Sequence, residues 1–292
     1  IYMIIKTIKF VKIIHMKRIA FLVLYPFLLL ISLLPFSILY ILSNIISFTL
    51  FYIIGYRRKM IKKNLTLSFP NLNINERNKI ERKFYTHMCD IFLEMIKSMT
   101  ISLSSINNRF RVNNMELLTQ FPKNNRSVII ICGHYASYEW MLFLANDFGA
   151  STYGIYTPLS NQYFDKLVKK IRVKHNAYLI SRYHTIDTIR KHQDSNHRAV
   201  YGFAADQSPY PKKKTYWRSF MGNKVPVFTG AERLAIEHNI PVVYADIKRV
   251  DRGFYEVDFK LISDFPKETK KHEITDISVS YTHLTLPTMF EV

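Results

Sequence analysis

A histidine and a glutamate five positions apart, His134 and Glu139, are the residues of this sequence best placed to do chemistry. They follow Gly133 and the β-branched run at 127–132, so we expect a buried strand to end directly before them. On one continuous helix the two side chains would point about 140° apart. They can meet if His134 lies in the strand-to-helix turn, which Gly133 makes easy, and Glu139 lies in the first helical turn.

In that arrangement a carboxylate orients an imidazole that accepts a proton, as in a catalytic triad without its serine. The alternative is a structural histidine with satisfied hydrogen bonds. The spacing alone does not decide between them, because ten histidines and 22 acidic residues produce such a pair by chance. The position directly after a strand and a glycine is what supports a catalytic role.

Signatures of other chemistries do not occur in the sequence. There is no C-x-x-C or H-E-x-x-H, and we expect His192 and His197 to be solvated in a polar loop, so no metal site is predicted. The sequence also has no G-x-S-x-G nucleophile elbow, no phosphate-binding P-loop and no G-x-G-x-x-G. We therefore expect neither a metal nor a cofactor.

The elements that must position this pair alternate between strands and helices. The pattern predicts an α/β fold with a mixed, mostly parallel central sheet flanked by helices. Before it, apolar residues at spacings of three and four predict a helix over 75–99. The expected strands are 127–132, 151–156, 178–180, 199–205, 242–248 and 254–261, and the expected helices are 137–146, 161–174, 185–192 and 230–238.

The amino-terminal quarter predicts a membrane-embedded helical segment, because no charged residue occurs from Ile19 to Tyr56. A single helix of that length would exceed the roughly 30 Å hydrocarbon core of a bilayer. Pro26 and Pro35 are expected to break it. The segment is then either one span followed by an interfacial helix, or a re-entrant hairpin.

Basic residues flank both ends of the apolar segment and predict its orientation. Since both clusters favour the cytoplasmic side, the bulk of the chain should be cytoplasmic and held against anionic headgroups. A cleaved signal peptide fits poorly because the apolar run is too long, and a buried helix pair of a soluble protein is the other alternative. The flanking residues are Lys12, Lys17 and Arg18 on one side, and Arg57, Arg58, Lys59, Lys62 and Lys63 on the other.

Composition limits the function classes. The 292 residues carry a net charge of +19 and are 48% hydrophobic, which excludes a disordered chain. Only two cysteines, Cys89 and Cys132, are present, which excludes a disulfide-stapled secreted domain. A nucleic-acid binder, a protein of an anionic membrane surface and an enzyme with an anionic substrate remain, and no recognisable nucleic-acid-binding module supports the first.

Taken in order, these features and several short motifs resemble the bacterial lipid A biosynthesis acyltransferases, within the lysophospholipid acyltransferase group. The resemblance runs from about Met16 to residue 275. The matching motifs are Arg57-Arg58, Asn64-Leu65, Phe69-Pro70, G-H-Y-x-x-x-E-W at 133–140, Tyr156-x-Pro158-Leu159-x-Asn161, Arg172, Asp206-Gln207, Phe220-x-Gly222, Pro226, Thr229-Gly230 and Pro241-Val242-Val243.

The resemblance implies a glycerolipid-acyltransferase-like fold and transfer of a fatty acyl group from acyl carrier protein to a hydroxyl of an anionic lipid A precursor. It implies His134 as the general base, oriented by Glu139. An activated thioester needs no cofactor, and backbone N–H groups after His134 could stabilise the oxyanion. The residues expected to bind substrate are Arg172, Asp206, Gln207, Tyr156 and Asn161, with Lys166, Lys169, Lys170, Lys212, Lys213, Lys214 and Arg218 as further cations for the acceptor or the acidic carrier protein.

Asp206 and Gln207 are expected to organise the site, with a structural N-cap role for Asp206 as the alternative. The acceptor could instead be another lipid, such as an aminolipid or a lysophospholipid. A non-catalytic, membrane-tethered basic binding protein is the alternative from another class. The enzyme interpretation places the protein at the inner membrane with its catalytic domain on the cytoplasmic face.

The sequence also suggests boundaries. Met16 resembles a start, so residues 1–15 are expected to be an upstream non-native leader, followed by a membrane anchor over 16–58. The cytoplasmic acyltransferase domain is expected over 59–275. Residues 276–292 do not match the family pattern and are expected to be a non-native tail on a domain truncated at its C-terminus.

Overall fold

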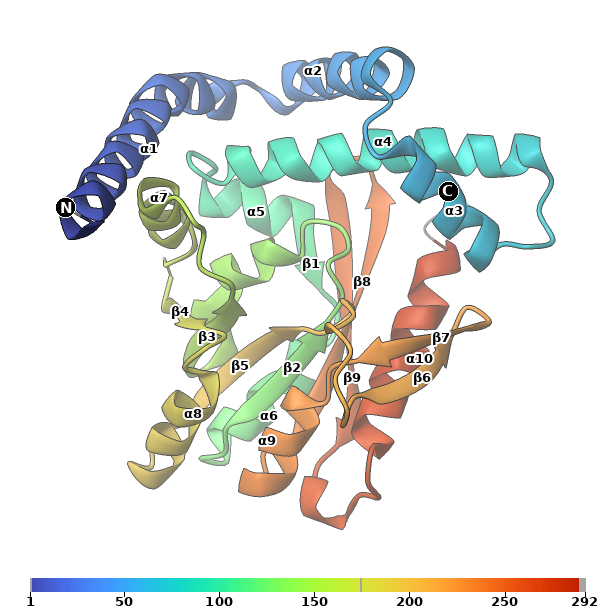
Figure 1. Cartoon of the computed structure of the whole chain (residues 1–292). Coiled ribbons are helices and arrows are strands. Elements are labelled where there is room, and N and C mark those ends of the chain that lie inside the picture. The colour runs from blue at the N-terminus through green and yellow to red at the C-terminus, as the bar shows by residue number, and fades with distance from the viewer. Residues whose placement is uncertain (1, 174, 289–292) are drawn as a thin grey trace.

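A seven-stranded sheet forms the centre of the computed structural model, which describes residues 2–173 and 175–288 and the side chains of 15–173 and 175–282. The strand order is β1-β9-β8-β2-β5-β3-β4, and every pair is parallel except β8 with β9 (Figure 1). The mixed, mostly parallel sheet predicted from the sequence is confirmed. The strands are β1 (Phe110–Val112), β2 (Val128–Cys132), β3 (Ser151–Tyr156), β4 (Ala177–Ser181), β5 (Ala199–Ala204), β8 (Val242–Asp251) and β9 (Phe254–Ser263).

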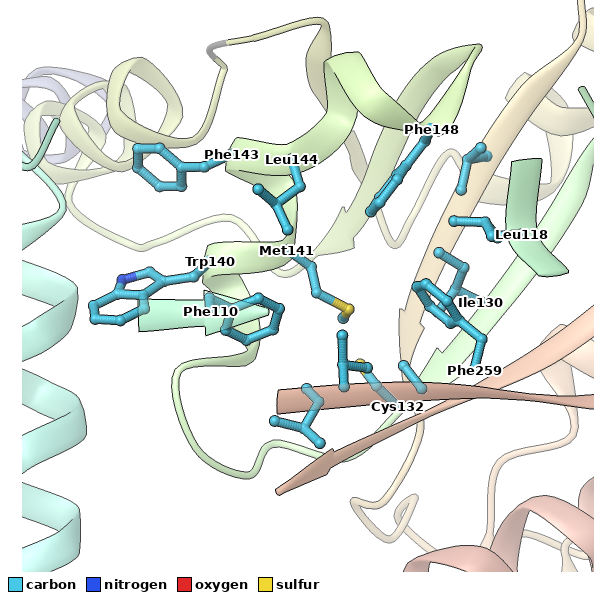
Figure 2. Packing of buried hydrophobic residues seen from close by; sticks show 14 of the residues in the cluster. Phe110, Leu118, Ile130, Cys132, Trp140, Met141, Phe143, Leu144, Phe148 and Phe259 are labelled. Carbon is cyan, nitrogen blue, oxygen red and sulfur yellow. The ribbon is translucent and has the colours of Figure 1, made fainter. Parts of the chain in front are cut away.

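Helices cover both faces of this sheet and bury its central strands. On one face, a 3₁₀ helix, η2 (Tyr138–Phe148), packs with α5 (Leu103–Arg109) and α6 (Met115–Lys123) over an aromatic-rich core (Figure 2). On the other face, α8 (Thr185–Asp194), α9 (Gly230–His238) and α10 (Glu273–Thr288) cover a second core. Because β2 is buried at all five positions, its end is a rigid support for the residues that follow it.

Most elements predicted from periodicity are present within a few residues of their expected bounds, including α4 (Ile74–Lys97) and α7 (Gln162–Arg172). The segment after His134 is a 3₁₀ rather than an α-helix. Several elements were not predicted. They are α3 (Arg58–Ser68), α5, β1, α6, the short helix η3 (Pro266–Glu268) and a separate hairpin of β6 (Tyr216–Phe220) with β7 (Asn223–Val227). α10 crosses the expected boundary at 275–276 and packs on β8, while residues 289–292 of the expected tail lie outside the described part.

The amino-terminal segment forms two long apolar stretches. α1 (Tyr2–Leu33) continues through Pro26, so the break predicted there is wrong: the loss of one backbone hydrogen bond does not end this helix. The break predicted at Pro35 is confirmed, and α2 (Phe36–Phe48) with η1 (Thr49–Ile54) follows it. Two stretches, His15–Leu33 and Phe36–Ile54, are long and apolar enough to cross a membrane. α3 (Arg58–Ser68) then leads to α4, along which α2 packs.

Buried polar contacts fix α2 on α4 and α4 on the sheet and the turn that follows β2. Ser43 donates to Asp90 at 2.6 Å, and Arg252, from the β8–β9 turn, binds both oxygens of Asp90 at 2.6 and 3.0 Å. Glu94, which is fully buried, accepts hydrogen bonds from the hydroxyls of Tyr40, Tyr255 and Ser137. Burial raises the pKa of Glu94, while these three donors favour its ionised form. One carboxyl thus links α2, β9 and the turn that follows His134.

His87, a half-buried histidine of α4 with a buried Nε2, predicts acid sensitivity. Burial and the neighbouring Arg249 lower the pKa of His87 from 6.5 to about 4, with Asp90 opposing that shift. Between pH 6.5 and pH 4 the unfolded chain binds a proton at His87 and the folded chain does not. The free energy of unfolding therefore falls as the pH decreases from 6.5 towards 4. The shift corresponds to roughly 3 kcal/mol.

The test compares wild type with His87→Gln by chemical unfolding in non-ionic detergent at pH 7 and pH 4. The difference between their unfolding free energies should change in the variant's favour by roughly 3 kcal/mol on acidification. A difference that does not depend on pH would contradict this account.

Candidate active site

The carboxyl ends of β2 and β5 bring together the two residues at the centre of the candidate site. The strands are parallel neighbours in which Cys132 is paired with Ala204, so His134 and Asp206 leave the sheet side by side. Asp206 Oδ2 accepts the main-chain N–H of His134 at 2.8 Å, and Asp206 Oδ1 lies 2.5 Å from His134 Nδ1. One carboxylate therefore fixes both the backbone and the ring of the histidine.

Gly133 permits this close approach. A Cβ atom at that position would lie 3.3 Å from Asp206 Oδ2, which is tighter than ordinary van der Waals contact. The glycine noted in the sequence thus serves a packing purpose as well as forming the turn. His134 lies in the turn and Glu139 in the first turn of η2, as the sequence predicted.

The ring of His134 is held with its second nitrogen available. With Nδ1–H donating to Asp206, Nε2 carries the lone pair, and the side-chain amide nitrogen of Gln207 lies 3.5 Å from it. Tyr138 packs edge-on against the imidazole at 5.2 Å between ring centroids. The His134 side chain is 34% exposed, and His134 lines a cavity.

The partner of His134 differs from the one expected. Glu139 binds Arg172 instead, accepting from Nε at 2.9 Å and from Nη2. A guanidinium fork matches a carboxylate in this two-point geometry, and Asp206 already occupies Nδ1. The prediction that Glu139 orients the imidazole is corrected: Asp206, which sequence reasoning placed in the site but not on the ring, has that position. No sequence signal gives the strand order that makes β5 the neighbour of β2.

A cavity of about 780 Å³ opens beside this pair. His134, Glu139, Arg172 and Gln207 line it, together with Tyr156 at the end of β3, and most of the remaining lining is apolar. Its volume is in the range of ligand pockets. The structure therefore brings all but two of the expected site residues to one cavity wall, and Asp206 stands directly behind His134.

Asn161 has a structural position. Its side chain caps α7 by accepting the N–H of Tyr163, and its amide donates to the carbonyl of Lys17 in α1. It does not appear among the residues that line the cavity in the described structure.

The basic residues expected to bind the acceptor or the carrier protein differ in whether they already form ion pairs. Lys169 pairs with Asp165 at 3.0 Å, and Arg218 pairs with Asp276 at 3.2 Å. Lys212, Lys213 and Lys214 are exposed, and none has an ion pair among the described residues.

His192 and His197 are not solvated as expected. They lie half-buried, with His192 Nδ1 3.0 Å from the Tyr201 hydroxyl and His197 Nε2 3.1 Å from that of Tyr153. Aromatic packing at the amino-terminal edge of the sheet has drawn both rings inward. Within the described part of the chain, no group of three or more potential ligands could hold a metal ion.

Comparison with known proteins identifies one family. The model of the bacterial lipid A biosynthesis acyltransferases matches residues 8–279, which is most of the chain. A search of curated proteins found no match.

The contact between Asp206 and His134 Nδ1 predicts that acyl transfer depends on which ring nitrogen of His134 carries the proton. In Asp206→Asn, an amide that donates to Nδ1 would place the proton on Nε2 and remove the base. We expect kcat for acyl transfer to fall by about 10²- to 10⁴-fold with little change in KM. Asp264→Asn, which breaks the 2.5 Å surface ion pair with Arg126, is the control and should retain activity. Equal activity of both variants would refute the role of Asp206.

Proposed function

Because the chain belongs to the bacterial lipid A biosynthesis acyltransferase family, we propose that it transfers a fatty acyl group from acyl carrier protein to a hydroxyl of a lipid A precursor. The observation that carries the proposal is His134, fixed by Asp206 and exposed to a largely apolar cavity. A base beside an apolar pocket is what transfer of a long acyl chain from a thioester requires.

His134 Nε2 takes the proton of the acceptor hydroxyl as its oxygen attacks the thioester carbonyl carbon. The tetrahedral intermediate then collapses, the carbon–sulfur bond breaks, and the imidazolium returns the proton to the departing thiolate. Asp206 stabilises the imidazolium in between. General-base catalysis of this kind contributes about 10²- to 10⁴-fold. Since the N–H of His134 is bound to Asp206, the oxyanion must take its donors from elsewhere in the turn.

Glu139 and Arg172 form the polar wall of the cavity. Arg172 has five N–H donors, and the pair with Glu139 uses two of them. The remaining donors can bind a phosphate or sugar oxygen of the acceptor while Glu139 holds the guanidinium in place. Tyr156 and Gln207 complete this wall. Acyl carrier protein, an acidic partner, would dock on the exposed lysines 212–214.

The anchor supports a location at the inner membrane with the catalytic domain on the cytoplasmic face. α2 packs on α4 through Leu39, Ser43 and Ser47, and its opposite face exposes apolar side chains at helical spacing. These outward residues are Ile38, Ile41, Ile45, Phe48 and Tyr52. A helix with one face on the protein and an apolar outer face suits the interface, so we favour α1 as the inserted element and α2 as an interfacial helix.

Replacement of the base tests the proposed chemistry. His134→Ala should abolish acyl transfer, measured by mass spectrometry with a panel of acyl carrier protein thioesters and candidate acceptors, and should retain vesicle binding. His184→Ala, an exposed histidine outside the cavity, is the matched control. If wild type transfers the acyl group only to an aminolipid or a lysophospholipid, the acceptor is that lipid rather than a lipid A precursor. Full transfer by His134→Ala would refute His134 as the base. No transfer by wild type, together with retained vesicle binding by both proteins, would leave the non-catalytic binding protein as the better account.

Charges on the outer face of α2 test the anchor. Ile41→Glu/Ile45→Glu should weaken binding to anionic vesicles by about tenfold or more, because two apolar side chains leave the lipid. The control is Leu261→Glu, which changes an exposed leucine of β9. Equal flotation of the two variants with vesicles would rule out α2 as a membrane contact.

A further inference from the structure

The cavity beside His134 is lined from both faces of the sheet. Along β5, Ala204 packs with the core beneath η2, whereas Phe203 and Ala205 pack with the core beneath α8 and α9. All three residues line the same cavity. The cavity therefore extends around the carboxyl edge of the sheet and has an apolar chamber on each side of it.

The first chamber lies between η2 and the sheet and is here called the η2 chamber. Its lining is apolar or small and includes Ile130, Met141, Leu142, Gly154, Gly202 and Ala204. Gly202 keeps space open, since a Cβ there would have only the Tyr153 carbonyl oxygen, at 3.9 Å, within 4 Å. Glu139 and Arg172, which also line the cavity, form an ion pair with each other. A neutral hydrocarbon chain suits this chamber.

The second chamber, here called the α8–α9 chamber, lies between those helices. An ion pair of 2.6 Å between Arg190 and Glu237 joins α8 and α9 towards their carboxyl ends, whereas residues from their amino ends line the cavity. A Cβ at Gly230 would meet nothing within 4 Å, so the space there is open. Its apolar lining is Ile155, Ile186, Phe203, Ala205, Phe228, Ala231 and Leu234.

Two arginines distinguish this chamber from the first. Arg182 and Arg233 line the cavity, both are exposed, and neither side chain has a hydrogen bond or ion pair among the described residues. The guanidinium carbon of Arg182 lies 5.6 Å from the centroid of the Tyr183 ring. Arg190 and, to a smaller extent, Arg233 lower the pKa of Glu237, but Glu237 forms its ion pair with Arg190. Guanidinium groups with free N–H donors beside an apolar space match a ligand that has a hydrocarbon chain and a phosphate or carboxylate.

We propose that the α8–α9 chamber binds a hydrocarbon chain of the anionic acceptor lipid, with Arg182 and Arg233 on its charged group, while the acyl chain of the donor occupies the η2 chamber. The inference rests on the proposed function, which requires two apolar substrates at one base. His134 then stands where the two chambers meet, so that the thioester and the acceptor hydroxyl approach it from opposite faces of the sheet.

Photocrosslinking of the full chain in non-ionic detergent tests the assignment without turnover. The probes are a diazirine-bearing lysophosphatidic acid and a diazirine-bearing acyl-pantetheine, with labelled peptides identified by mass spectrometry. Gly230→Leu should lower labelling by the lysophosphatidic acid by about tenfold or more and leave acyl-pantetheine labelling unchanged. Gly202→Val, the matched variant of the other chamber, should do the opposite. Unchanged thermal unfolding confirms that both variants fold.

The charge of the ligand is tested by Arg182→Gln/Arg233→Gln. This variant should lower labelling by the lysophosphatidic acid by about tenfold and leave labelling by a monoacylglycerol carrying the same chain unchanged. Lysophosphatidic acid labels on η2-chamber peptides, or insensitivity to Gly230→Leu, would overturn the assignment. If wild type shows no acyl transfer but keeps the separate labelling patterns, the proposed function fails and with it the donor and acceptor roles, whereas separate binding of the two probes in the two chambers stands.

Discussion

The carboxylate of Asp206 holds His134 at two points, and the geometry of the site depends on that double contact. It needs β2 and β5 to be parallel neighbours in one register and needs a glycine at position 133 to let the carboxylate approach. The contact orients the ring, sets its tautomer and leaves Nε2 facing the cavity. A buried central strand makes this arrangement stiff, because β2 has no solvent-exposed position at which it could relax. The sheet thus supplies the preorganisation that a general base requires.

A second set of buried polar contacts connects this site to the apolar helix α2. Glu94 accepts hydrogen bonds from the hydroxyls of Tyr40 in α2 and of Ser137, which lies three residues after His134. Trp140 adds to the same support by donating its indole N–H to Ser98 at 3.1 Å. Buried carboxylates are stable only when such donors surround them, so α2 cannot leave α4 without exposing unmatched polar groups in the core. α2 is therefore built into the same unit as the site around His134.

Sequence reasoning could predict the strands because their runs are short, apolar and bounded by turn residues, and it found His134 because Gly133 follows such a run. It could not predict the orienting carboxylate, since the pairing of β5 with β2 depends on tertiary packing rather than on local pattern. Glu139 was the obvious candidate by proximity in the chain, but Arg172, arriving from α7, binds it. The β6–β7 hairpin was missed because Pro226, which cannot donate to a ladder, argues against a strand at its position. The inward turn of His192 and His197 depends on tyrosines from neighbouring strands.

Nitrogen-15 NMR of the histidine rings tests the central claim most directly. The full chain, labelled at histidine and held in detergent micelles, would be measured near neutral pH, with the His134 signals assigned by their loss in His134→Gln. The account predicts a protonated Nδ1 and an unprotonated Nε2 with the chemical shift of a free lone pair. A ring protonated at Nε2 and bare at Nδ1 would contradict it, because His134 could then neither donate to Asp206 nor accept a proton from a substrate hydroxyl.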